Sequence, residues 1–305
     1  MRTLYPFVIA FLLSQTSYSQ KVTLGLHLDK GHTYYQLIHS QTRIGEAVNG
    51  QDIEINMSIY GKTAYLVKDI INGDYQMEVI FKSLEMDMES PQKKVQFSSE
   101  KNDTTDILSS LLSEMTNKAF TITLTKKGKV EDVNGLDNIF DHLLDKFSQL
   151  KQEQKQQIKD QLMKAYGAKA MKGSIEMVTS VFPDIPVKKG DQWNIMTQLE
   201  SGFPISLQSE YQYNGSSDST YLIHGVGKMN TADKEAYIES NGMPLKYDLS
   251  GTLESDIQIE RNSGWISSAT ITEKMKGNME VKDNPKIPGG MVIPMTIETV
   301  SSVKE

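Results

Sequence analysis

The chain of 305 residues contains no cysteine. This absence excludes disulfide bonds, thiolate metal sites and cysteine nucleophiles. We also expect no lipid-modified N-terminal cysteine. A chain of this length can bury a large core without disulfides, so we expect its stability to come from buried apolar area.

Basic residues are fewer than acidic ones. The sequence has 32 Lys and Arg residues against 39 Asp and Glu residues, a net charge of −7. Loss of an N-terminal segment that contains Arg2 would leave 31 against 39, a net charge of −8. Because nucleic acids bind proteins mainly through cationic side chains, we expect no nucleic-acid partner.

The sequence also lacks recognisable catalytic groupings. It has five histidines, and no two of them lie at metal-ligand spacing. It contains no Gly-x-Ser-x-Gly turn, phosphate-binding loop or dinucleotide fingerprint. Glu85, Asp87 and Glu89 alternate on one predicted strand face, where neighbours lie about 7 Å apart, and we interpret them as a solvated surface. We therefore expect a protein that is not an enzyme and uses neither a metal nor a cofactor.

Long apolar runs are absent after the N-terminus, where no window approaches the roughly 20 residues of a membrane-spanning helix. The first nineteen residues have Arg2, an apolar run over 4–13 interrupted by Pro6, and small residues before Gln20. This pattern predicts a signal peptide over 1–19, cleaved near Ser19–Gln20. We expect a secreted or periplasmic protein that does not span the membrane.

What the sequence does contain is alternation of apolar and polar residues, which is typical of strands with one buried face. Hairpin turns are predicted at Asn72–Gly73 and Gly61–Lys62, and the phase slips before Leu84, as at a bulge. Residues 22–98 are predicted to form five or six antiparallel strands. The alternating apolar residues are Ile53, Ile55, Met57, Ile59, Tyr75, Met77, Val79 and Phe81.

The middle of the chain, residues 104–182, has apolar residues at spacings of three and four, which predicts helices. One helix is expected to begin near Ile107, a long second one runs from Leu136 to Tyr166, and a third includes Ile175. A short hairpin turning at Lys127–Gly128 separates the first two. Each predicted helix has one apolar stripe, so we expect the helices to lie on the sheet.

Strand patterns return over residues 190–302, with a turn at Asn262–Gly264 and a last strand in which Pro294 suggests an edge or a bulge. The order strands, helices, strands predicts an α+β fold in which a large curved antiparallel sheet, half-barrel-like, wraps around a central helical block. We expect a single domain over 20–305. Two domains that divide near residue 185 are the alternative.

The junction after the helices reads Pro-Val-Lys-Lys-Gly-Asp-Gln-Trp over 186–193. This run, with Lys127–Val130 and Asn134–Gly135, resembles a Bacteroidetes family of exported proteins of unknown function. The resemblance brings no established activity, so no site residue is carried over. The residues also have a structural explanation, a turn at Gly190–Asp191 and an anchoring role for Trp193. The layout is similar to the lipoprotein-carrier half-barrel, which implies an apolar cavity for acyl chains.

Methionine is frequent on the predicted strands, and its flexible thioether suits both irregular cores and adaptable apolar ligand sites. We predict a non-enzymatic binding protein for a lipid-like or other apolar small molecule. The alternative is a cell-envelope interaction or scaffold module with a protein partner and no small ligand, using a sheet edge or surface tyrosines such as Tyr211, Tyr213 and Tyr247. The predicted cavity-lining residues are Ile55, Met57, Ile59, Met77, Val79, Phe81, Leu253, Ile257, Met275 and Met279.

Overall fold

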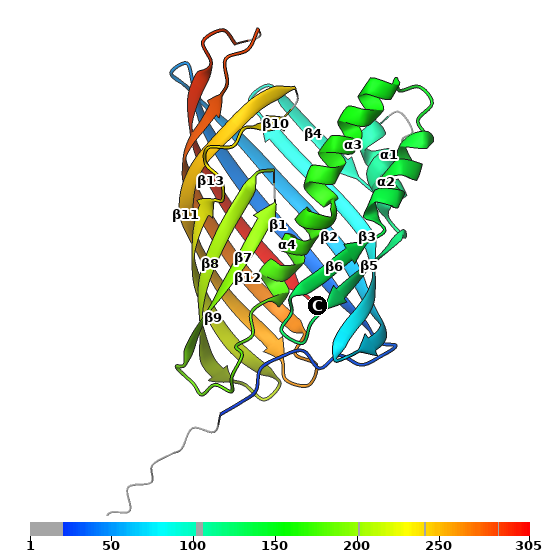
Figure 1. Ribbon diagram of the computed structural model, residues 1–305, viewed down its shortest axis with the longest axis vertical. Helices are drawn as coiled ribbons and strands as arrows, with labels where there is room; N and C mark the ends of the chain where they lie inside the picture. The colour runs from blue at the N-terminus through cyan, green and yellow to red at the C-terminus, as the bar shows by residue number, and fades with distance from the viewer. Residues whose placement is uncertain (1–20, 102–105, 201, 241, 286) are drawn as a thin grey trace, which may run out of the picture.

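The structure is a computed structural model that describes residues 21–101, 106–200, 202–240, 242–285 and 287–305. The predicted signal peptide lies outside these residues. Thirteen strands form one open antiparallel sheet in the order β6-β5-β3-β2-β1-β13-β12-β11-β9-β8-β7, with β4 paired to β3 and β10 to β11. Figure 1 shows that this sheet is strongly curved, so the predicted half-barrel of an α+β fold is confirmed.

The strand bounds follow the predicted regions with two changes. The chain before β1 contributes one isolated bridge at Val22 and no strand, and residues 33–98 form four strands. The strands are β1 (Thr33–Val48), β2 (Gln51–Ile71), β3 (Asp74–Ser90), β4 (Lys93–Ser98), β5 (Ala119–Leu124), β6 (Val130–Asn134), β7 (Gln192–Glu200), β8 (Pro204–Ser216), β9 (Thr220–Thr231), β10 (Ile238–Ser240), β11 (Met243–Glu260), β12 (Ile266–Val281) and β13 (Met291–Lys304).

The predicted turn at Asn72–Gly73 is confirmed, because both residues adopt positive φ, 53° and 94°, between β2 and β3. The predicted turn at Gly61–Lys62 is wrong, since β2 runs straight through it. The phase slip before Leu84 is a bulge, as predicted. Thr63 pairs with Phe81 and Lys62 with Ser83, which leaves Lys82 as the extra residue.

Four helices lie on the concave side of the sheet: α1 (Ile107–Met115), α2 (Leu136–Asp145), α3 (Gln152–Tyr166) and α4 (Ala168–Thr179). The predicted long helix over 136–166 is broken between α2 and α3, where the Lys151 amide donates to Gln154 Oε1 at 3.0 Å and a new helix begins. Helix α4 contacts β7 and β6, the two ends of the strand order, and thus lies in the mouth of the half-barrel (Figure 1). No helix in the described ranges is long and apolar enough to cross a membrane.

Buried apolar side chains form two groups on the inner face. The first core cluster joins the helices to the sheet and includes Phe81, Phe120, Phe140, Ile257 and Trp265. The second core cluster includes Leu207, Leu249, Leu253, Met275, Met279 and Ile293. The Trp265 indole donates to the Tyr35 carbonyl at 3.0 Å and so fixes the turn after β11 against β1.

Pro294 was predicted to mark an edge or a bulge, but β13 lies in the middle of the sheet and its pairing shows no register shift. The pairing of β13 with β1 ends at Met295, while Pro294 still faces Asn278 on β12. The missing amide of the proline therefore falls where one side of the strand has no partner.

Candidate functional site

The structure divides the residues predicted to line a ligand site into a packed group and an accessible group. Ile55, Met57 and Ile59 are partly accessible and belong to neither core cluster. Seven others are almost completely buried within the two clusters, where they fill the core. They are Met77, Val79, Phe81, Leu253, Ile257, Met275 and Met279. The accessible group therefore supplies apolar surface on the concave face that a ligand could contact.

Strand pairing extends this accessible surface onto β3. Met57 faces Met88, and Ile59 faces Met86. Met86 is partly accessible and Met88 is 37% exposed, although both lie in the phase that points to the concave side. We call Ile55, Met57, Ile59, Met86 and Met88 the open wall. It is a row of flexible and branched apolar side chains on the inner face of β2 and β3, a composition typical of sites for apolar molecules.

Two pairs of hydroxyl groups border the open wall on the side of β1. Thr42 faces Met57, and Ser40 faces Ile59. The Thr42 and Thr299 hydroxyls lie 3.0 Å apart, and the Ser40 and Ser301 hydroxyls lie 2.7 Å apart. Each hydroxyl can donate once and accept twice, so each pair keeps unused acceptor capacity.

Glu273 stands next in the same row, because it pairs with Thr299 on one side and Leu253 on the other. Its neighbours in phase along β12 are Ile271 and Met275, both buried. Burial raises the pKa of Glu273 from 4.5 to about 7, without a contribution from any charged neighbour. The side chain is nevertheless partly accessible.

A second carboxylate shares the concave face. Glu46 lies on β1 between Met295 and Ile53, and its charge adds to burial in raising the pKa of Tyr247. Tyr247 stacks on Phe203 with ring centroids 4.5 Å apart. On the inner positions of β1, β2, β3, β11, β12 and β13, which the structure describes in full, Glu46 and Glu273 are the charged side chains. The inner positions of these six strands thus carry two negative groups and no positive one, while Lys93 of β4, which pairs with Ser90, lies in the same phase beyond Met88.

One further buried polar atom lies beside Glu273. Ser255 occupies the position diagonal to it on β11, since it pairs with Ile271. It is 3% exposed, and its hydroxyl has no hydrogen-bond partner among the residues that the structure describes. Buried hydroxyls normally have a partner, so this part of the face has unused hydrogen-bonding capacity.

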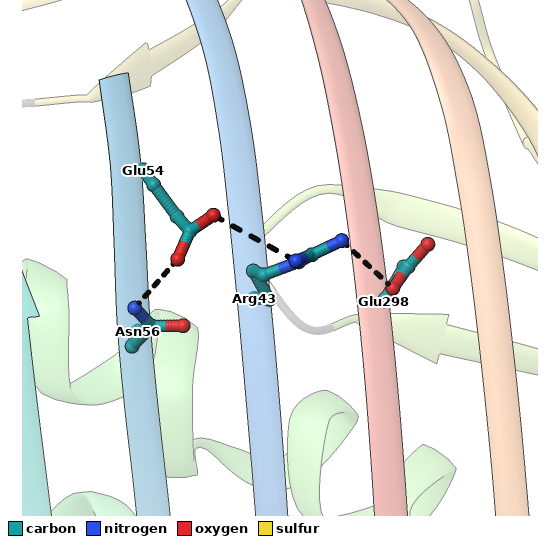
Figure 2. Close-up of polar contacts among 4 residues, drawn as sticks. All are labelled: Arg43, Glu54, Asn56 and Glu298. Atoms are coloured by element: carbon teal, nitrogen blue, oxygen red, sulfur yellow. Dashed lines mark hydrogen bonds and ion pairs between the residues drawn. The ribbon is translucent and has the colours of Figure 1, made fainter. Parts of the chain in front are cut away.

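The outer face of the same strands has a different character. Figure 2 shows Arg43 between Glu54 and Glu298, with nitrogen–oxygen distances of 3.8 Å and 3.4 Å. Asn56 donates to the other oxygen of Glu54 at 3.0 Å. These side chains are exposed, and exposed ion pairs typically contribute less than about 1 kcal/mol. Glu85, Asp87 and Glu89 also lie in this outer phase.

Strand register also creates one pair that the sequence did not indicate. His224 Nδ1 lies 2.9 Å from Asp256 Oδ1, between β9 and β11 on the outer face. A nucleophilic triad would need a hydroxyl or thiol on the other imidazole nitrogen. In the described ranges no such group is hydrogen-bonded to His224, and no three potential metal ligands gather anywhere in them.

A hollow of about 570 Å³ also lies on the outer side of β7, β8, β9 and β11. Its walls include Asn194, Gln208, Glu210 and Lys228. Val226, Gly227, Thr252, Leu253 and Glu254 complete the lining, so charged and apolar side chains are mixed there. The concave face is the better candidate for the predicted site because its accessible row is made of apolar side chains alone.

The surface tyrosines proposed for the scaffold alternative are not at the surface. Tyr211 and Tyr213 are each 4% exposed and belong to the first core cluster, while Tyr247 is partly buried on the inner face. Alternation places all three in the apolar phase of their strands. Glu273 was missed by the sequence analysis, although a glutamate in the apolar phase between Ile271 and Met275 is the signal that could have identified it.

Comparison with known proteins gives a family match and distant structural similarities. The model of a family of unknown function, DUF6263, matches residues 72–266. No curated protein sequence matches the chain. A structure titled "Lipid-protein interactions in lipovitellin" has a TM-score of 0.49 and 10% identity over 91% of this chain and 25% of that one. Pseudomonas aeruginosa OpdQ has a TM-score of 0.20 and 7% identity over 89% of this chain and 98% of that one. The chain spans a quarter of the length of the lipovitellin chain, and neither similarity carries an argument about function.

Proposed function

The chain belongs to DUF6263, a family of unknown function, and from its geometry we propose that it is a non-enzymatic binding protein for a lipid-like or other apolar small molecule. The ligand lies on the concave face, against the open wall. The observation that carries this proposal is that Met57, Ile59, Met86 and Met88 point to the concave side and yet remain accessible.

The energetic reason is the apolar area that a ligand would remove from water. Covering a whole methionine or isoleucine side chain contributes about 1.5–3 kcal/mol, and covering a partly accessible one contributes a fraction of that. The five residues of the open wall together therefore supply a useful part of the binding free energy. The neighbouring hydroxyl pairs supply a place for a polar end.

The proposal includes export of the protein. The signal peptide predicted over 1–19 supports export. The mature protein then acts outside the cytoplasm as a secreted or periplasmic carrier. The intact mass of the protein recovered from the extracellular or periplasmic fraction should correspond to cleavage near Ser19–Gln20. A mass that includes residues 1–19 would contradict export through a cleaved signal.

The binding site can be tested with a neutral apolar dye. We expect Nile red to bind the wild-type protein, and Met57→Asp to weaken this binding about tenfold or more, because a carboxylate on the open wall must be desolvated by the dye. Ser58→Asp is the matched control, since Ser58 follows Met57 and lies in the outer phase of β2. Fluorescence titration measures both. Equal effects of the two substitutions, or no binding by the folded wild-type protein, would contradict the proposal.

The scaffold alternative has one observation in its favour. Tyr35, Leu37, Tyr60 and Val300 lie in the outer phase of β2, β1 and β13 and are 39–49% exposed. Such a patch suits a protein partner of the cell envelope. Substitution of Leu37 and Tyr60 by Ser would abolish capture of that partner while leaving Nile red binding unchanged, whereas the ligand proposal predicts that these substitutions have no functional effect.

A further inference from the structure

The chemistry of the concave face also bears on which kind of polar end the ligand has, an inference that rests on the proposed function. Cross-strand pairing places Met57, Thr42, Thr299 and Glu273 side by side on β2, β1, β13 and β12. Adjacent strands lie about 4.8 Å apart, so the row from Met57 to Glu273 is about 14 Å long. A molecule lying along this row would have its apolar part on the open wall and its polar end at Glu273.

The charge of this surface selects among polar ends. Glu46 and Glu273 are both acidic, and no lysine or arginine occupies an inner position on β1, β2, β3, β11, β12 or β13. A ligand with its carboxylate or phosphate end at Glu273 would meet repulsion there, since the lysine of the inner phase, Lys93 of β4, lies beyond Met88 at the other end of the row. A ligand with a cationic end would meet a carboxylate that lacks a partner in the described part of the chain.

The hydrogen-bonding groups near Glu273 indicate which cationic end group fits best. An ammonium group has three N–H donors and no acceptor. Glu273 and the hydroxyls of Thr299 and Thr42, the next two residues of the row, offer acceptors in sequence. Since the two threonine hydroxyls lie 3.0 Å apart, a single small group can contact both.

We propose that the ligand of the concave face is an apolar molecule ending in a primary amine, whose ammonium group pairs with Glu273 and donates to Thr299 and Thr42. The pairing supplies the partner that the buried carboxylate lacks, and charge-assisted hydrogen bonds of this kind are among the stronger ones in proteins. The ammonium ion also lowers the pKa of Glu273 when it binds, so binding near neutral pH releases a proton from the carboxyl group.

Three probes of equal chain length test this proposal by isothermal titration calorimetry at pH 8. Dodecylamine should bind the wild-type protein about tenfold or more tightly than dodecanol, and dodecanoate should bind more weakly than either. In Glu273→Gln the preference for dodecylamine over dodecanol should disappear. Glu254→Gln is the matched control, because it removes an exposed carboxylate from the outer phase of the adjacent strand, and it should keep the preference.

A second measurement separates the role of Glu273 from any effect on folding. Dodecylamine titrations at pH 6.5, in buffers of different ionisation enthalpy, should show proton release for the wild-type protein and none for Glu273→Gln. If dodecanol or dodecanoate binds the wild-type protein as tightly as dodecylamine, the amine is the wrong polar end while the proposed function stands. If none of the three probes binds folded wild-type protein, the proposed function fails as well.

Discussion

Glu273 is an ionisable residue at a strand position where the alternation calls for an apolar one. Its position in β12 belongs to the apolar phase, with Ile271 before it and Met275 after it, both buried. An ionised carboxylate at such a position is desolvated and has no described partner. The group therefore lowers the stability of the folded protein whenever it is charged, which is a cost that a bound cation would offset.

This cost predicts an unusual pH dependence of stability. Because the pKa of Glu273 is about 7 in the folded protein and 4.5 ordinarily, the folded state binds the proton more tightly than the unfolded state. The contribution of this group to stability is fully present below pH 4.5 and is lost as pH rises through 7. The loss amounts to up to about 3 kcal/mol, reduced by the partial accessibility of the side chain.

Urea denaturation at pH 5 and pH 8 measures the effect. The free energy of unfolding of Glu273→Gln should change less between the two pH values than that of the wild-type protein, and the variant should be the more stable one at pH 8. Glu254→Gln should follow the wild-type profile. If Glu273→Gln and the wild-type protein have parallel profiles, the carboxyl group is not desolvated as described.

The sequence could predict which side chains share a face but not how each one is used. Alternation correctly placed Met57 and Met77 in the same phase. It could not show that Met77 is 1% exposed while Met57 stays accessible, because that difference arises from the helices and strands that cover one end of the sheet. His224 and Asp256 are 32 residues apart, so their contact depends on strand register, which the sequence does not reveal.

Among the elements, helix α4 is the one that covers both ends of the strand order. Gly173 makes close approach to β7 possible, since a Cβ atom at this position would lie 2.7 Å from the Gln198 carbonyl oxygen. At its C-terminal end, the Thr179 hydroxyl donates to the Gly128 carbonyl at 2.6 Å and so joins α4 to the β5–β6 turn. Lys127 in the same turn donates to the Pro183 carbonyl.

We expect Gly173→Val to destabilise the protein by about 1–3 kcal/mol, because the added side chain must push α4 away from β7. The variant should also aggregate more readily, since β7 is an edge strand that α4 covers. Thermal unfolding and light scattering measure the two effects. Lys172→Val is the control, as it places the same β-branched residue at an exposed position of α4. Equal behaviour of the two variants would mean that α4 does not protect this edge.

At this scale the sequence predicted element types better than element boundaries. The hairpin at Asn72–Gly73 follows from two residues that tolerate positive φ. Gly61–Lys62 looks similar as a dipeptide, yet β2 continues through it for 21 residues in all. The pairing of Gly61 with Leu84 and Lys62 with Ser83 holds the strand extended, and such long-range pairing is not visible in a local pattern.

For the whole molecule, β13 is the element that joins the two strand-rich regions. It pairs with β1 over Leu37–Glu46 and with β12 over Ser268–Val281. Alternation predicted the curved α+β sheet, but it could not predict that the final strand lies in the middle of it. An apolar phase specifies a buried face and leaves the identity of the neighbouring strand open.

A single domain remains our prediction, and it implies one cooperative unfolding transition. Far-UV circular dichroism and tryptophan fluorescence should give coincident urea curves. Val303→Asp puts a charge at a position that is 2% exposed. It should lower the free energy of unfolding obtained from both curves by several kcal/mol. Val300→Asp, at a position of β13 that is 49% exposed in the outer phase, should leave the free energy of unfolding from both curves unchanged. Two separate transitions would favour the alternative of two domains that divide near residue 185.

The central place of β13 has a consequence for biogenesis. A ribosome or an export channel delivers the chain from its N-terminus. Strand β1 therefore cannot pair with β13 until residues 291–304 emerge. Until then the backbone edges of β1 and β12 that β13 covers stay unpaired and can pair with other chains. Truncated translation products lack the joining strand and so offer quality-control proteases an unfinished target.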